Sequence, residues 1–211
     1  PGLSEIYAQT LLAMEKHEQA VPVLRQITAA HPEDIDAKLE LARALVDTKT
    51  APDEAVRTIQ VVLDAQPAHA EARALMAEAL ALGGKFAESL QAYQSALETD
   101  LVANPDWSSR LSLGLGKVAL AMNQPDIAIA ALEEAAQADP QNHLILITLC
   151  DAYRQAGLLA DALQTARQTL RIAPDDSDTL AWFAETIVEF PASPSHETAT
   201  GENSFLQIEA L

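Results

Sequence analysis

A small side chain recurs along this chain at nearly constant spacing, with intervals of 34, 35, 39, 34 and 34 residues. A large apolar residue precedes each small one, and a second small residue follows about twelve positions later. The first small residues are Ala8, Ala42, Ala77, Gly116, Cys150 and Ala184. Because bulk would separate two helices that cross closely, small residues mark such crossings. The spacing therefore predicts a repeated pair of packed helices.

Proline residues stand near the end of most repeats, where a helix has to stop before the next begins. They are Pro32, Pro67, Pro140 and Pro174. In these features the chain resembles the tetratricopeptide repeat (TPR) family, whose 34-residue unit is a helix, a turn and a second helix. The resemblance covers roughly residues 1–190. It implies an all-α fold, a right-handed α-solenoid of stacked helix-turn-helix repeats, with five full repeats, a sixth first helix and a C-terminal tail.

Two departures from the family pattern affect the middle of the chain. Leu101 stands where the third repeat should have its proline, and residues 101–105 lengthen the step to the fourth repeat. We expect this insertion to extend a helix or to loosen the junction before Trp107.

The repeats are expected at about 1–34, 35–69, 70–105, 106–142 and 143–176, with a half repeat at 177–190. An alanine-rich composition with few aromatic residues and few glycines suits closely spaced helices. The expected helices span about 3–14, 18–30, 36–47, 53–65, 70–82, 86–99, 108–122, 126–138, 143–156, 159–172 and 177–190.

The C-terminal tail has two parts. Residues 191–203 are polar and proline-rich, and they are expected to form a flexible linker. In residues 204–211 apolar side chains recur every three positions, as in a short amphipathic helix. We expect this helix to cap the array over Trp182 and Phe183, which the sixth first helix would otherwise expose. The alternative is that residues 204–211 begin a further repeat.

The formal charge is −18, from 31 acidic and 13 basic residues. Such a chain repels nucleic acid and anionic lipid, so neither is an expected partner. The acidity serves either solubility or a preference for basic ligands. No apolar run reaches the length of a membrane span, so no direct membrane insertion is expected. Because the chain begins at Pro1, we interpret it as a fragment or processed product. A cytoplasmic location is favoured, and a periplasmic or membrane-tethered location is the alternative.

The sequence offers no catalytic, cofactor or metal motif. Cys150 is the only cysteine, and its repeat position favours a buried small side chain over a reactive thiol. The five histidines are scattered without the spacing of metal ligands, so solvated or junction-packing histidines are favoured. We therefore expect a protein that is not an enzyme and has no cofactor and no metal.

The resemblance implies that the first helices line a concave groove that holds a protein or peptide ligand. Carried onto this chain, the groove positions are mostly acidic with apolar residues between them. The candidate groove residues are Glu5, Gln9, Asp36, Leu39, Arg43, Asp47, Glu71, Glu78, Arg110, Leu113, Lys117, Ile147, Asp151, Arg154, Glu185 and Glu189. Each charged residue taken singly also fits an ordinary solvated helix face.

Two specialised TPR ligand sites are missing. The Lys and Asn that clamp a C-terminal carboxylate are replaced by Glu5 and Gln9 in the first repeat, and the asparagine ladder of glycosyltransferase-linked arrays is absent. Arg110 and Lys117 form a basic pair that could anchor one acidic side chain. The leading interpretation is a scaffold that binds a basic or apolar peptide or helix; the alternatives are an arm of a larger enzyme, transporter or secretion complex, and self-association through the array ends.

Overall fold

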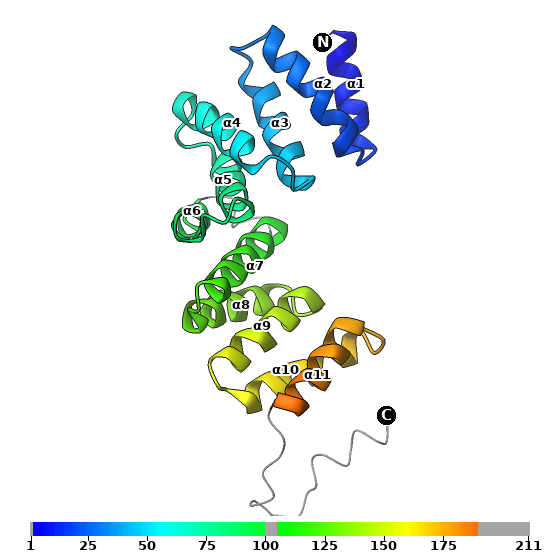
Figure 1. The fold of residues 1–211 in the computed structure, drawn as a ribbon, viewed down its shortest axis with the longest axis vertical. Coiled ribbons are helices and arrows are strands. Elements are labelled where there is room, and N and C mark those ends of the chain that lie inside the picture. The colour runs from blue at the N-terminus through cyan, green and yellow to red at the C-terminus, as the bar shows by residue number, and fades with distance from the viewer. Residues whose placement is uncertain (1, 100–104, 190–211) are drawn as a thin grey trace, which may run out of the picture. The chain divides into compact units, whose positions relative to one another are not determined.

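The structure is a computed structural model that describes residues 2–99 and 105–189, except the side chains of 105, 106, 178 and 187–189. These residues form helices and no strand, which confirms the all-α prediction. The chain divides into two compact regions, residues 1–174 and 175–211, and each is described by itself. Five helix pairs form the first region (Figure 1). The expected linker at 191–203 and capping helix at 204–211 lie outside the described residues.

The helices follow the expected order closely. The first helices of the repeats are α1 (Leu3–Ala13), α3 (Ile35–Asp47), α5 (Ala70–Leu82), α7 (Pro105–Ala121) and α9 (His143–Gln155). The second helices are α2 (His17–Ala30), α4 (Pro52–Ala65), α6 (Phe86–Leu97), α8 (Pro125–Ala138) and α10 (Leu159–Ile172). Helix α11 (Ser177–Glu189) belongs to the second region. Most ends fall within one or two residues of the expected ones.

The largest difference is at α7. This helix begins at Pro105 rather than near residue 108 and is 17 residues long, the longest among the described helices. Proline is tolerated in the first turn of a helix, where its missing N–H would have no partner. The insertion before the fourth repeat therefore extends a helix, one of the two outcomes expected from the sequence.

Residues with positive φ end several first helices. Gly84 and Gly157 have φ angles of 73° and 78° in the turns after α5 and α9. This left-handed conformation costs glycine nothing, because glycine has no Cβ. Asn123 takes the same role after α7, with φ of 57°. Each first helix therefore stops where the sequence predicts, and the chain reverses into the second helix.

Small residues allow the two helices of a repeat to approach closely. A Cβ added at Gly116 on α7 would lie 2.6 Å from Cγ of Leu132 on α8. In the third repeat, Ser89 on α6 is fully buried and donates a hydrogen bond of 2.7 Å to the carbonyl of Ala77 on α5. The small residues predicted from the spacing thus lie at the helix crossings.

A second close approach joins consecutive repeats. Tyr93 on α6 is 4% exposed, and a Cβ added at Gly114 on α7 would overlap the Tyr93 ring. Glycine is needed at this position because no larger residue leaves room for the ring. The sequence pattern did not predict this contact, since it joins two repeats rather than two helices of one repeat.

The apolar core follows the chain instead of having one centre. One group of buried residues joins α1 to α5, a second joins α5 to α8, and a third joins α7 to α9. Each helix of the first region packs mainly on its sequence neighbours. This is the distribution of contacts expected of stacked repeats.

On α11, Trp182 is 5% exposed, and its ring packs edge to face on Phe183 with a centroid separation of 5.6 Å. Ala184 is exposed, whereas its counterparts in the first region are buried. At the N-terminus of α11, the Asp176 side chain accepts a hydrogen bond of 2.8 Å from the Thr179 backbone N–H.

No helix in the described part of the chain combines the length and hydropathy that a bilayer span requires.

Candidate functional site

The two sides of the repeats differ in how closely their helices approach. The first helices pack on one another in sequence: α3 contacts α5, α5 contacts α7 and α7 contacts α9. Among the described residues, the second helices have no such contacts with one another beyond isolated ones. Side chains of neighbouring repeats therefore meet on the first-helix side, which we call the first-helix face.

The structure places most of the candidate groove residues on the first helices of the first region. They are Glu5 and Gln9 on α1, Asp36, Leu39, Arg43 and Asp47 on α3, Glu71 and Glu78 on α5, Arg110, Leu113 and Lys117 on α7, and Ile147, Asp151 and Arg154 on α9. Glu185 is exposed on α11 in the second region. The side chain of Glu189 is not among those that the structure describes.

An ion-pair network joins three of the first helices. Arg110 on α7 donates two hydrogen bonds, of 2.6 and 2.5 Å, to the carboxylate of Glu78 on α5. Its guanidinium also lies 3.5 Å from the Asp47 carboxylate on α3. The Glu78 side chain is only 14% exposed, so this network is partly shielded from solvent.

Burial lowers the pKa of Arg110, but the hydrogen bond to Glu78 and the negative charges of Glu78 and Asp47 together raise it above its ordinary value. Burial raises the pKa of the nearby Tyr93, and the negative charge of Glu78 raises it further. The ion pair is therefore packed against the core contact between α6 and α7. The expectation that Arg110 is available to anchor a ligand is wrong, because Glu78 and Asp47 already occupy its guanidinium.

Two other ion pairs use predicted groove residues. Arg43 on α3 bonds to the carboxylate of Glu71 on α5. On α9, Arg154 lies 3.0 Å from Asp151. Such pairs are neutral as a unit, so the face carries less free negative charge than its residue types indicate.

The apolar positions of the face differ in exposure. Leu39 is 9% exposed and belongs to the core, so it is not available to a ligand. Leu113 on α7 and Ile147 on α9 are half-buried on adjacent helices that contact each other. Lys117, one turn from Leu113, is exposed and forms no ion pair with any described residue. These three side chains form one accessible part of the face, on α7 and α9.

Trp107 is a residue that the repeat pattern missed. Its half-buried ring lies 5.2 Å from the Arg110 guanidinium, within the range of a cation–π contact. Its only signal in the sequence is an aromatic residue directly after the insertion. Trp107 also packs against the buried residues that join α5 to α8.

The remaining candidates contribute no chemistry here. Cys150 is fully buried, and burial raises the pKa of its thiol to about 12. His69 begins α5, where its Nδ1 accepts a hydrogen bond of 3.2 Å from the Ala72 backbone N–H, so it is a junction-packing histidine. Across the residues that the structure describes, no group of three His, Cys, Asp or Glu side chains is placed to hold a metal ion.

Comparison with known proteins bears on both the repeats and the fold. Two family models described as tetratricopeptide repeat match residues 11–79 and 113–177. The TPR repeat-containing protein YpiA of Bacillus subtilis (strain 168) is 24% identical over 229 residues, which covers 90% of this chain and 52% of that protein. The chain thus spans about half the length of this curated relative.

Solved structures share the fold at low sequence identity. MamA is 19% identical with a TM-score of 0.65, covering 84% of this chain and 96% of the other. The fragment of MamA from residue 41 to its end, from Desulfovibrio magneticus RS-1, is 17% identical with a TM-score of 0.70, covering 83% and 96%. The thermophilic TPR protein TTC0263 of Thermus thermophilus is 21% identical with a TM-score of 0.62, covering 86% and 96%. By its repeats and its fold, the chain belongs to the tetratricopeptide repeat family.

Proposed function

We propose that this protein is a non-catalytic scaffold that binds a segment of a partner protein on its first-helix face, across α7 and α9. The observation that carries the proposal is the open group formed by Leu113, Lys117 and Ile147 on two first helices in contact. Two half-buried apolar side chains beside an unpaired cation can hold an apolar segment that carries an acidic residue.

The proposed ligand carries an acidic residue, whereas the acidic composition of the sequence favoured a basic ligand. Glu71 and Glu78 are held by Arg43 and Arg110, so they are poorly placed to attract a basic peptide. Reversing either to lysine would set two cations together and would test the ion pairs rather than ligand binding. Lys117 is the better residue to change, because its ammonium has no ion-pair partner in the described residues.

The test is photo-crosslinking followed by affinity measurement. A benzoylphenylalanine at position 147 should crosslink a partner in extracts of the source cells, and the same residue at exposed Gln94 on the second-helix side should not. For the purified partner, Ile147→Asp should weaken binding about tenfold, because it places a charge in an apolar contact.

Lys117→Glu should weaken the same complex about fivefold and mainly through the association rate, as expected for an exposed charge. Equal crosslinking from positions 147 and 94, or unchanged affinity of both variants, would disprove the first-helix face as the binding surface. Circular dichroism of each variant checks that the helices are intact.

A further inference from the structure

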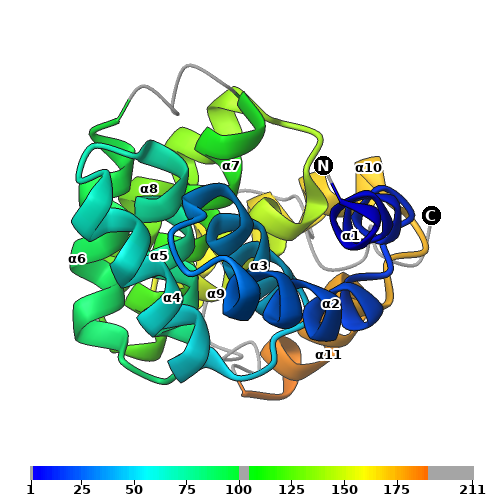
Figure 2. The same cartoon turned by 90° about the horizontal axis from the view of Figure 1, so that it is seen from above.

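The opposite side of the repeats carries a pocket that the family pattern does not predict. Residues of α2, α3 and α4 line it, and α3 lies between the other two helices (Figure 2). Its volume is about 380 Å³, and it is open to solvent. We call it the α2–α4 pocket; its lining is Arg25, Thr28, Ala29, Lys38, Leu41, Glu54, Arg57, Thr58 and Val61.

Three of the chain's 13 basic residues line this pocket, against one acidic residue. Arg25 holds the Glu54 carboxylate with two hydrogen bonds of 2.8 and 2.6 Å, which lower the pKa of Glu54 and keep it charged. Lys38 and Arg57 form no ion pair among the described residues, although the charge of Arg57 also lowers the pKa of Glu54. The pocket therefore has two cations in excess, although the chain as a whole is strongly acidic.

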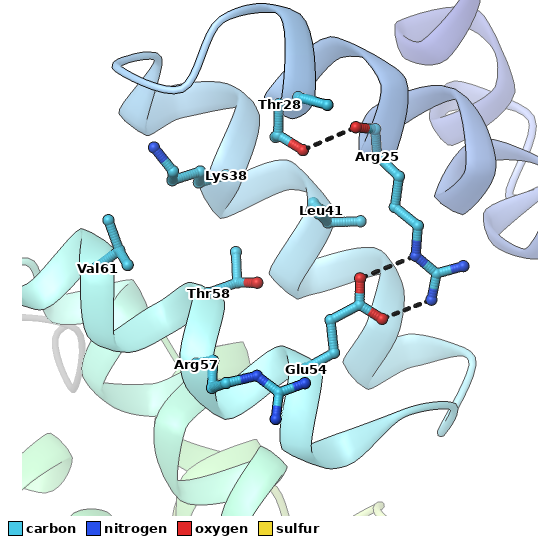
Figure 3. A pocket seen from close by; sticks show the side chains of 9 residues that line it. Arg25, Thr28, Lys38, Leu41, Glu54, Arg57, Thr58 and Val61 are labelled. Carbon is cyan, nitrogen blue, oxygen red and sulfur yellow. Dashed lines mark hydrogen bonds and ion pairs between the residues drawn. The ribbon is translucent and has the colours of Figure 1, made fainter.

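The cations do not converge on one point. Figure 3 shows Arg25, Lys38 and Arg57 at separate places around Leu41 and Thr58. Lys38 donates one hydrogen bond to the Pro32 carbonyl, which leaves two of its three ammonium donors. A single phosphate needs donors that meet at one place. Separate cations around an apolar centre are better suited to an extended peptide segment that carries several carboxylates.

The apolar part of the lining supports the same ligand. Val61 and Leu41 both line the pocket, and the two residues are 44% and 4% exposed. Thr28 and Thr58 add hydroxyl groups between the cations, and the Thr28 hydroxyl is bonded to the Arg25 carbonyl at 3.2 Å. An apolar side chain of a ligand can pack on Val61 while neighbouring carboxylates reach Lys38 and Arg57.

The equivalent junctions of the other repeats lack this charge. The repeat register aligns Arg25, Lys38 and Arg57 with Gln60, Arg73 and Gln91 at the next junction. At the following junction the three positions are Gln94, Ser112 and Ala130, and at the last they are Glu133, Leu146 and Gln164. A structural requirement of the repeat would recur along the array. The three cations occur together only between α2 and α4.

We propose that the α2–α4 pocket binds an acidic segment of a partner protein, in which carboxylates pair with Lys38 and Arg57 and an intervening apolar side chain packs on Val61. This surface is separate from the first-helix face, and the two can be occupied at the same time by different partners or by two parts of one partner.

The experiment uses the full chain labelled with ¹⁵N and a capped six-residue peptide of alternating glutamate and leucine. Amide shifts should change within residues 25–29, 38–41 and 54–61. The double variant Lys38→Gln/Arg57→Gln should weaken the peptide about tenfold, since it removes two charge-assisted contacts. A peptide with glutamine in place of glutamate should cause no shifts in these segments.

Arg73→Gln is the matched control. Arg73 occupies the same repeat position as Lys38 and bonds to the Pro67 carbonyl at 3.1 Å, as Lys38 bonds to that of Pro32, but it lacks neighbouring cations. This variant should bind the peptide like the parent. Shifts confined to other helices, equal weakening by Arg73→Gln, or inorganic phosphate that produces the same shifts at equal concentration would each overturn the proposal.

Discussion

The two sides of the same repeats differ in which of their basic residues form ion pairs. On the first-helix face, Arg110 and Arg43 are held by carboxylates from neighbouring repeats. In the α2–α4 pocket, Arg25 is paired with Glu54, but Lys38 and Arg57 form no ion pair with a described residue. Both sides are built from helices with similar sequences, so residue type alone does not explain the difference.

Helix spacing explains it. Adjacent first helices are in contact, so an arginine on one helix reaches a carboxylate on the next. Second helices are separated by the intervening first helix, and the space between α2 and α4 is open. A basic residue is paired where a carboxylate of a neighbouring repeat lies within reach, as for Arg110 and also for Arg25 in the pocket, whereas Lys38 and Arg57 form no ion pair across repeats in the described residues.

The largest expected effect comes from the packing that brings the repeats together. Gly114→Ala should lower the free energy of unfolding by about 1–3 kcal/mol, because its Cβ overlaps the Tyr93 ring. The loss should occur although alanine favours a helix over glycine by about 1 kcal/mol. Urea denaturation followed by circular dichroism measures it.

Gly83→Ala is the control for this substitution. Its Cβ would meet only ordinary contacts of 3.5 Å or longer, and its φ is −80°. Stability should therefore stay nearly unchanged. If both variants behave alike, the close approach of Tyr93 to Gly114 does not hold α6 and α7 together.

A smaller effect is expected in the coupling energies of the ion pairs on the two sides. Double-mutant cycles should give a coupling energy of about 1 kcal/mol for Arg110 with Glu78 and about 0.5 kcal/mol for Arg25 with Glu54. The reason is solvent screening, since the carboxylate side chains are 14% and 28% exposed respectively. Both couplings should decrease in 1 M salt. A stronger coupling for the Arg25 pair would contradict the comparison.

The pH dependence of two glutamates should give the smallest effect, with opposite signs. The hydrogen bond from Arg25 holds the pKa of Glu54 below its ordinary value, so this residue stabilises the fold above that value and the contribution is lost as pH falls through the folded pKa. Glu54→Gln should therefore be less stable than the parent at neutral pH, and the difference should vanish in acid.

Burial raises the pKa of Glu40 on α3, so its charged form weakens the fold. Glu40→Gln should be more stable than the parent at neutral pH, and this gain should disappear as pH falls below the ordinary carboxyl range, where both states are protonated. Carbon-detected NMR titration measures both pKa values directly. A Glu40 that titrates below Glu54 would show that these assignments are reversed.

Much of the fold could be predicted because local rules fix it. The spacing of small residues predicted the helix crossings, which the structure has at Gly116 and Ser89, and the expected helix ends fall at turns where Gly84 and Gly157 have positive φ. The site was harder to predict. Family positions named Arg110 and Leu39 as ligand contacts, but Arg110 is held by Glu78 and Leu39 lies in the core.

The sequence by itself determined that the chain folds into stacked helix pairs, because a repeat of about 34 residues with small residues at the crossings can bury its apolar side chains only against its neighbours. Only the tertiary structure decided which charges are paired. Pairing depends on distances between helices about 30 residues apart in the chain, and these follow from how closely each pair of helices packs. Arg110 and Arg57 are the same kind of residue in the sequence, but Arg110 lies within reach of the Glu78 carboxylate on the neighbouring first helix, while Arg57 lines an open pocket.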